Sequence, residues 1–371
     1  MIKLIKKSAG KIFHLLCKFF LPKRYYDPIF ISEFIKDAKS SGNLDFKKKY
    51  WSFRHGFLPH EYSRYNLSVN DYRGYIPARN SFQKRTINGT FNSILANKII
   101  FERHIKSVLE GIDNIHVVES IGFIEEGYLK SLKPDITTGD FMSLKTFLNK
   151  AEIILKPTIG DGGVGLFHLK KENDSYSLNS KKLDWEEVLS ELKKLKHYLI
   201  QERLRQKGFS SNINPDAVNS MRIATMIDPI SQQPFIAYGV HRFGSVHSGF
   251  LDNINQGGIG SVINIEDGIL TNALYFSPDG QIESYDEHPL SSKPIAGEKI
   301  PGWDSVKDRI IQMAGRMPYL KYVGWDIILS DDQLFIMEGN VSPGLNVLQV
   351  FFPMKDLIQT WSFFKYYNYI D

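Results

Sequence analysis

The sequence predicts a mixed α/β (α+β) protein made of two or three packed subdomains. Its 371 residues are too many for one simple core. Helix-like and strand-like patterns alternate from 97 to 156, and the stretches 221–265 and 324–340 contain strand-like runs between polar or glycine-rich turns. With 42% hydrophobic and 23% charged residues, the composition is that of an ordinary globular enzyme.

The single cysteine, Cys17, excludes an intramolecular disulfide and any cysteine-based zinc or iron–sulfur site. This cysteine usage fits a reducing compartment, and we expect a cytoplasmic protein. No apolar run in the sequence reaches the roughly 18 residues needed to span a bilayer. The sequence therefore does not predict a transmembrane protein.

Residues 1–24 carry seven basic side chains, no acidic one, and apolar residues at helical spacing. This pattern predicts a basic amphipathic helix. Such a helix either lies on the anionic inner face of the cell membrane or packs on its own domain, and the sequence leaves both open. The seven charges exceed the net charge of +5, so the remaining chain is slightly acidic and does not predict nucleic-acid binding.

Residues 25–95 predict a mostly helical region without a chemical motif. His55 and His60 have no third ligand nearby, so they indicate an incidental pair rather than a metal site. From 96 to 150 we expect an α/β segment, with helices over 97–110 and 140–150 and a short strand at 116–118.

The stretch after 151 contains a lysine and a glycine-rich loop between two strands. Pro157 favours an extended backbone at Lys156, so the ammonium group is presented from a strand. The loop has glycine at four of six positions, where it can close over a ligand and turn backbone N–H groups toward phosphate oxygens. It lacks the ending of a P-loop, and a strand follows where a dinucleotide fingerprint would open a helix. The pattern favours a nucleotide clamp over 151–208, with these loop glycines: Gly160, Gly162, Gly163 and Gly165.

A capping-box-like start at Asp184 and Glu187 predicts a helix, and an apolar strand follows over 198–201. The strand ends in the segment 201–204, where backbone groups could pair with an adenine edge. By itself this pattern indicates only a buried strand.

Strands are expected over 221–227, 234–242 and 260–265. Arg222 and Arg242 lie in apolar surroundings, so each needs an anionic partner, and a structural salt bridge remains an alternative to a functional role. The polar, glycine-rich loop over 252–260 is suited to contacting a substrate.

The hairpin over 324–340 brings candidate metal ligands together. With a three-residue loop at 331–333, Asp326 lies opposite Glu338, and Asn340 shares the face of Glu338. Two carboxylates and an amide oxygen suit Mg²⁺. A two-residue loop would shift the register and turn Asp326 to the other face. An ordinary surface hairpin remains the alternative.

Together these segments resemble the ATP-grasp enzymes, and in particular the sugar-transfer-associated ATP-grasp group found with bacterial surface-polysaccharide genes. The resemblance covers roughly residues 95–352. It rests on the lysine, the glycine-rich loop, the acidic hairpin and these further segments: 201–204, 219–223, 252–253, 257–258, 288–289, 300–303, 324–326 and 343–345.

The resemblance implies two α+β subdomains that clamp ATP, over 151–208 and 209–371, with a helical N-terminal extension. It implies that Lys156, with Lys98 as a second contact, binds the phosphates, and that Arg222 steadies the transferred phosphoryl group. The other implied contacts are Glu202 and Leu204 at adenine, Arg242, Asp252, Asn253, Gly257 and Gly258 at the substrate, and Asp326, Glu338 and Asn340 at Mg²⁺.

The activity implied by this resemblance is an ADP-forming carboxylate–amine ligase. A substrate carboxylate attacks the γ-phosphate and an amine then displaces phosphate, which gives an amide. We expect small-molecule partners, a carboxylate and an amine, one of them a uronic acid or amino sugar of a capsule or O-antigen. A phosphotransferase on the same fold and a membrane-docked nucleotide-binding accessory protein remain the alternatives.

Overall fold

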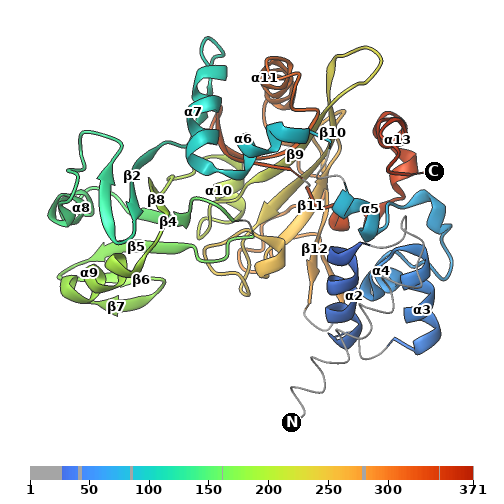
Figure 1. The fold of residues 1–371 in the computed structure, drawn as a ribbon, viewed down its shortest axis with the longest axis horizontal. Coiled ribbons are helices and arrows are strands. Elements are labelled where there is room, and N and C mark those ends of the chain that lie inside the picture. The colour runs from blue at the N-terminus through green and yellow to red at the C-terminus, as the bar shows by residue number, and fades with distance from the viewer. Residues whose placement is uncertain are drawn as a thin grey trace.

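Two β-sheets joined by helical layers form the fold of this protein in a computed structural model (Figure 1). The helix expected over 1–24 lies outside the described residues. Within the described part of the chain, no helix combines the length and apolarity that crossing a membrane requires. The structure describes residues 27–40, 44–83, 87–160, 162–277, 281–341 and 343–370.

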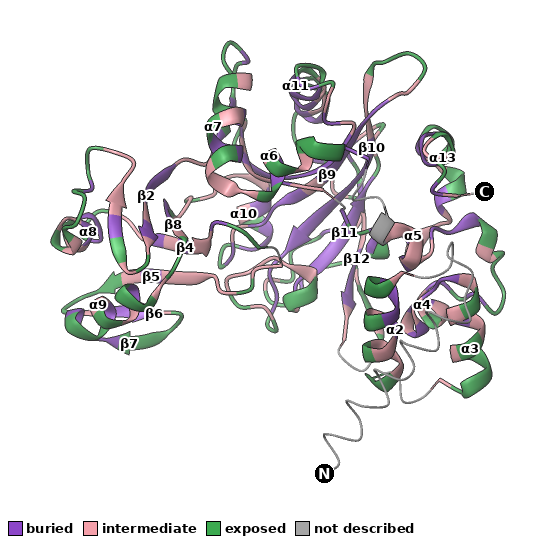
Figure 2. Cartoon of the chain, viewed as in Figure 1, coloured by how far each residue is buried: buried purple, intermediate pink, exposed green. Residues whose placement is uncertain are grey.

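The larger sheet has eight strands in the order β1-β15-β14-β9-β10-β11-β12-β13. The third strand of this order, β14, is buried along its whole length. Buried residues also follow the neighbouring strands β9 and β10 (Figure 2), because helices cover both faces of the sheet. The strands are β1 Ile115–Val117, β9 Met221–Ile227, β10 Pro234–Phe243, β11 Ile259–Ile263, β12 Leu270–Phe276, β13 Ile282–Tyr285, β14 Tyr322–Ser330 and β15 Gln333–Asn340.

Each face of the larger sheet has its own hydrophobic core. Successive residues of β9 point to opposite faces, so Ile223 belongs to the core under helices α7 and α11, and Ala224 to the core under α12 and α13. Helix α7 begins after Asn97, whose side chain accepts hydrogen bonds from two free backbone N–H groups. These helices are α7 Lys98–Val108, α11 Trp303–Gly315, α12 Asn346–Phe351 and α13 Ile358–Tyr366.

The smaller sheet has seven strands in the order β3-β2-β8-β4-β5-β6-β7 and packs against helices α8 and α9. Helix α9 begins with the expected capping box, in which Asp184 and Glu187 satisfy each other's backbone N–H groups. The elements are β2 Ser120–Glu125, β3 Tyr128–Ser131, α8 Phe141–Phe147, β4 Ile153–Pro157, β5 Phe167–Glu172, β6 Ser175–Leu178, β7 Lys181–Leu183, α9 Trp185–Lys194 and β8 Tyr198–Glu202.

The helical N-terminal region is attached by paired hydrogen bonds to helix α12 and to strand β14 of the larger sheet. The Gln349 side chain accepts from the N–H of Ile76 at 2.6 Å and donates to its carbonyl at 3.1 Å. Asn88 makes the same double contact with the backbone of Tyr322 at 2.8 and 3.0 Å. The remaining helices are α2 Pro28–Ser40, α3 Phe46–His55, α4 Pro59–Arg64, α5 Ala78–Gln83, α6 Asn92–Ala96 and α10 Phe209–Ile213, with 3-10 turns η2 Tyr72–Gly74, η4 Gly89–Phe91, η5 Ile254–Gln256 and η6 Met354–Asp356.

The two histidines of this region have separate partners. His55 Nδ1 lies 2.8 Å from the carbonyl oxygen of Trp51, whereas His60 Nδ1 lies 2.9 Å from the carboxylate of Asp37. In the described residues no cluster of histidine, cysteine and acidic side chains meets the requirements of a metal site. Each of the two histidines therefore has its own partner, and their interpretation as an incidental pair stays a prediction.

Candidate active site

The β14–β15 hairpin brings the two predicted metal-binding carboxylates together, although its turn differs from the expected one. Ser330 pairs with Gln333, so the loop contains two residues and the expected three-residue loop is wrong. A β-bulge farther along nevertheless places Asp326 directly opposite Glu338. The extra residue of the bulge replaces the missing residue of the loop, and the register of the two carboxylates is therefore kept.

The bulge consists of an extra residue at Met337. On a regular strand Met337 and Glu338 would point to opposite faces. Here both are partly buried between the buried residues Ile336 and Gly339, and both line the same cavity. Without the bulge the two-residue loop would pair Asp326 with Met337 and turn Glu338 into the core.

Two arginines hold the carboxylate of Asp326. Arg222 on β9 donates to it through Nε and Nη2, the latter at 2.9 Å, and Arg242 Nη2 on β10 lies 3.2 Å away. Burial opposes ionisation, but the two guanidinium groups outweigh it and hold the pKa of Asp326 well below its usual range. The arginines thus have the anionic partner that their apolar surroundings require, and this partner is itself a predicted metal ligand.

Glu338 has the opposite electrostatic environment. Burial and the neighbouring Asp326 carboxylate raise the pKa of Glu338, against the attraction of Lys98, whose Nζ lies 3.8 Å from the carboxylate. Two buried carboxylates that repel each other favour a divalent cation between them. Oxygen donors of this kind, completed by waters or phosphates, fit Mg²⁺.

Asn340, the third predicted ligand, lies at the edge of this group. Its Nδ2 donates to the carbonyl of Gly324 at 3.1 Å, and the residue lines a second cavity beside the first. Its amide oxygen has no hydrogen-bond partner among the described residues.

Lys98 and Lys156 bring two positive charges to the cavity from different elements. Lys156 extends from β4, and burial lowers its pKa to about 8. Lys98 begins α7, and its Nζ donates to the carbonyl of Gly160 at 2.6 Å. Lys98 therefore connects the glycine-rich loop to the carboxylate of Glu338.

The predicted loop glycines all have positive φ angles, from 72° at Gly162 to 134° at Gly160, which other residues rarely adopt. Gly160, Gly162 and Gly163 line the first cavity. Gly165 does not. A side chain at Gly165 would place its Cβ 2.8 Å from the hydroxyl of Tyr198, so this glycine permits close packing of the loop on its own sheet.

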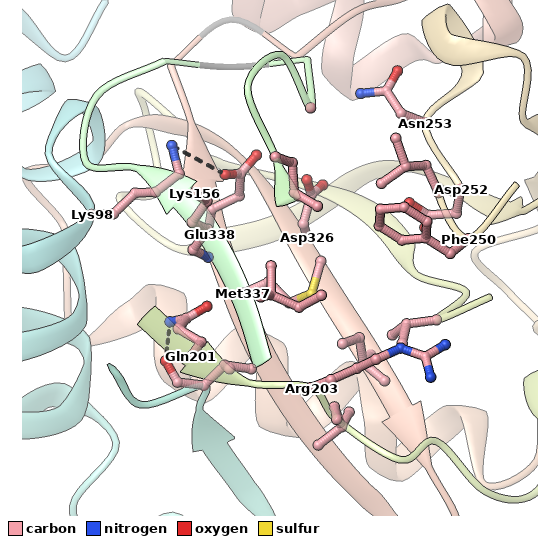
Figure 3. A pocket seen from close by; sticks show the side chains of 18 of the residues that line it. Lys98, Lys156, Gln201, Arg203, Phe250, Asp252, Asn253, Asp326, Met337 and Glu338 are labelled. Carbon is pink, nitrogen blue, oxygen red and sulfur yellow. Dashed lines mark hydrogen bonds and ion pairs between the residues drawn. The ribbon is translucent and has the colours of Figure 1, made fainter. Parts of the chain in front are cut away.

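The other end of the cavity is largely apolar (Figure 3). Met337 lies between this end and the charged group around Glu338. Glu202 and Leu204 line the same cavity, and their contact with adenine stays a prediction. Gln201, whose Nε2 donates to the carbonyl of Val118 at 3.0 Å, adds a fixed amide. The cavity is also lined by side chains that the sequence did not single out: Val118, Ile154, Gln201, Arg203, Val218, Phe250, Ile328 and Met337.

Different signals could have identified some of the missed residues. Gln201 and Arg203 belong to the segment recognised at the end of β8, and alternation along β4 and β14 could have indicated Ile154 and Ile328. Phe250 lies on a loop and has no such local signal.

A second cavity of about 870 Å³ adjoins the first. The two share Gly162, Arg222, Arg242 and Asn253 in their linings, so the arginines stand at the junction. Of the residues predicted to contact substrate, Arg242, Asn253 and Gly257 line the second cavity.

Asp252 and Gly258 are used differently from the expectation. Asp252 lines the first cavity, but its carboxylate accepts from the N–H of Ser220 at 2.8 Å and lies 3.6 Å from Arg242 Nε. Burial raises the pKa of Asp252, against the attraction of Arg242. Gly258 lines neither cavity, and a Cβ there would lie 2.5 Å from the carbonyl oxygen of Asp252. Asp252 thus positions Arg242, and Gly258 allows close backbone packing.

A glycine-rich loop, two lysines and a pair of carboxylates line one cavity, and together they define a nucleotide clamp of the ATP-grasp class. The chain belongs to the sugar-transfer associated ATP-grasp family, whose model matches residues 78–353. This match confirms the predicted fold and the family resemblance, and ATP and Mg²⁺ are the cofactors expected of the family. It begins before residue 95, where the sequence motifs placed the start.

The chain is also similar in fold to solved ATP-dependent enzymes. No curated protein matches it. The chain spans less than half of the first two structures named here. The first is an ADP complex of N5-carboxyaminoimidazole ribonucleotide synthetase, with 10% identity over 68% of this chain and 46% of that chain and a TM-score of 0.39. The second is a biotin carboxylase β,γ-ATP complex from Campylobacter jejuni, with 10% identity over 72% of this chain and 46% of that chain and a TM-score of 0.39. The third is D-alanine–D-alanine ligase from Bacillus anthracis, with 12% identity over 76% of each chain and a TM-score of 0.36.

Proposed function

We propose that this protein is an ADP-forming ligase that activates an acceptor carboxylate with ATP and joins it to an amine. The observation that carries the proposal is the position of Arg222 and Arg242, which line both cavities and contact Asp326. Phosphate from a nucleotide in the first cavity would meet an acceptor in the second at this junction. The description of the family as sugar-transfer associated supports a sugar-linked acceptor, such as a uronic acid or amino sugar of a capsule or O-antigen.

The side chains of the junction suit phosphoryl transfer to a carboxylate. Lys98 and Lys156 are placed to bind nucleotide phosphates, and Asp326 and Glu338 to hold Mg²⁺, which neutralises charge on those phosphates when bound. Arg222 and Arg242 would bind the incoming carboxylate and stabilise the charge that develops during transfer. Gln256 of the turn η5 donates a hydrogen bond to the carbonyl of Gly162 at 3.2 Å and so holds the glycine-rich loop in place. The loop would exclude water from the activated acceptor.

The reaction class can be tested with Mg-ATP and a panel of amino acids crossed with uronic acids and nucleotide sugars. We expect a productive pair to release ADP and phosphate in equal amounts. Hydroxylamine in place of the amine should capture the activated carboxylate as a hydroxamate. A stable phosphorylated acceptor without phosphate release would instead show a phosphotransferase, which the same geometry permits.

Lys156→Ala should lose both ADP formation and hydroxamate capture, because the variant lacks a cation for the phosphates. Lys150→Ala is a matched control: Lys150 is exposed beside the same sheet and lines neither cavity. Full activity in the Lys156 variant would contradict the proposed site.

A further inference from the structure

The second cavity has an unusual charge distribution. Three arginines, Arg64, Arg222 and Arg242, and His247 line it, and there is no aspartate or glutamate among the described residues of its lining. Arg222 and Arg242 are already paired with Asp326. Arg64 therefore decides whether the cavity has a free positive charge.

Arg64 ends helix α4 of the N-terminal region, outside the residues that the family model matches. Its guanidinium carbon lies 4.6 Å from the centre of the Phe276 ring on β12. Its buried Nε has no hydrogen-bond partner, and the guanidinium forms no ion pair with any described residue. The helix is fixed in this place by its neighbour Tyr65, which is buried and stacks on Tyr75 at 5.4 Å.

The two acidic residues that attract the guanidinium of Arg64, Asp37 and Glu61, have other hydrogen-bond partners. Asp37 binds His60, and Glu61 accepts hydrogen bonds from the N–H of Leu58 and the hydroxyl of Tyr65. Burial lowers the pKa of Arg64, a direction that reflects an incompletely compensated charge. A partly buried guanidinium without an acceptor is costly, and it binds carboxylate or phosphate strongly when either is available.

The rest of the lining of the second cavity is uncharged and includes the amides Asn255, Gln256 and Asn346. His247 stacks on Tyr275 at 4.7 Å and adds a flat surface. Amides and a ring face suit the hydroxyl groups and the ring of a sugar. With a volume of about 870 Å³ the cavity lies in the size range of small-molecule sites.

We propose that the acceptor is a polyhydroxy molecule with two anionic groups and that Arg64 binds the second of them. The reacting carboxylate lies at Arg222 and Arg242, and the other group, a carboxylate or a phosphate, lies against the guanidinium of Arg64. This inference rests on the proposed function, because it takes the second cavity as the acceptor site. It gives the N-terminal helical region a role in substrate specificity.

Calorimetric titration of the full-length protein, saturated with Mg-ADP, tests the inference with four probes. Glucuronic acid 1-phosphate and glucaric acid carry two anionic groups, and glucuronic acid and glucose 1-phosphate carry one. For at least one of the two-anion probes, the dissociation constant should be lower by about tenfold or more than that of either one-anion probe. The tighter of the two-anion probes shows whether the second group is a phosphate or a carboxylate. Equal binding of all four probes, or no binding of the two-anion probes, would overturn the inference.

Arg64→Met should remove the advantage of the two-anion probe, with a loss of about tenfold or more in affinity. The unfolding temperature should not fall, because no residue loses a hydrogen bond. Arg54→Met is the matched control: Arg54 lies exposed on neighbouring α3 and lines neither cavity, so the affinities should stay at the wild-type values. An unchanged affinity in Arg64→Met would refute the role of Arg64. Failure of the wild-type protein to bind Mg-ADP would instead count against the proposed function.

Discussion

At the scale of single residues, Asp326 serves two purposes. Its buried carboxylate compensates the charges of Arg222 and Arg242, and it is also placed to bind Mg²⁺ beside Glu338. Glu338 lies in the same cavity, but its main neighbours are the repelling Asp326 and the attracting lysines. The two carboxylates should therefore differ in what they contribute to folding, although the proposed reaction uses both as metal ligands.

We expect Asp326→Ala and Glu338→Ala both to abolish ATP turnover, because each removes a ligand that the phosphate-bound cation requires. Asp326→Ala should also lower the free energy of unfolding by about 3 to 5 kcal/mol, because two buried guanidinium groups lose their partner. Glu338→Ala should change stability little or increase it, because a buried, repelled carboxylate disappears. ADP release and urea unfolding measure the two effects.

Two results would contradict this division. Wild-type turnover in either variant would exclude the paired carboxylates as the metal site. Equal destabilisation of the two variants would show that Glu338 is as important as Asp326 for neutralising the cations around it.

At the scale of elements, the β-bulge in β15 determines which side chains face the first cavity. It turns both Met337 and Glu338 toward the cavity, so one short strand supplies a ligand for the cation and an apolar surface beside it. Met337 lies between the charged group and the apolar end of the cavity (Figure 3).

Met337→Ala should weaken ATP binding by about tenfold, because the shortened side chain buries less apolar area against the nucleotide. Met337→Leu is the control, since leucine has a similar volume and should bind ATP nearly as well as methionine. Both variants should keep the fold, which far-ultraviolet circular dichroism can check. An unchanged ATP affinity in Met337→Ala would remove this residue from the binding site.

At the scale of the whole molecule, the N-terminal region is part of the enzyme body rather than an appendage. Gln349 is 1% exposed and holds both backbone groups of Ile76, and Asn88 is 4% exposed and does the same for Tyr322. These contacts join the N-terminal region, which includes α4 and Arg64, to helix α12 and to strand β14 of the sheet that carries the candidate active site.

Gln349→Ala should lower the free energy of unfolding by about 1 to 3 kcal/mol, because it leaves a buried N–H and a buried carbonyl of Ile76 without partners. Gln359→Ala is the matched control, as the side chain of Gln359 is exposed and makes only a 3.4 Å contact with Asp228. Denaturant unfolding compares the two. A stable Gln349 variant would mean that the N-terminal region is not coupled to the sheet through this contact.

Much of the site could be predicted from local sequence. Strand-length apolar runs, a proline after Lys156 and glycines in a connecting loop reflect backbone preferences, which act within a few residues. The positions of Asp326 and Glu338 on one hairpin are local in the same sense. These features predicted the fold class, and with the family resemblance they indicated about half of the residues that line the first cavity.

Other features depend on contacts between distant segments, and only the tertiary structure decided them. The bulge at Met337 was not visible, because a strand's alternation does not show where one extra residue is accommodated. Asp326 forms ion pairs with two arginines, and Asp252 accepts a hydrogen bond from Ser220. Arg64 lines the second cavity together with residues of the larger sheet. Each of these contacts joins residues that are far apart in the chain. Sequence determines which charges exist, whereas packing determines which of them remain unpaired and available to a ligand.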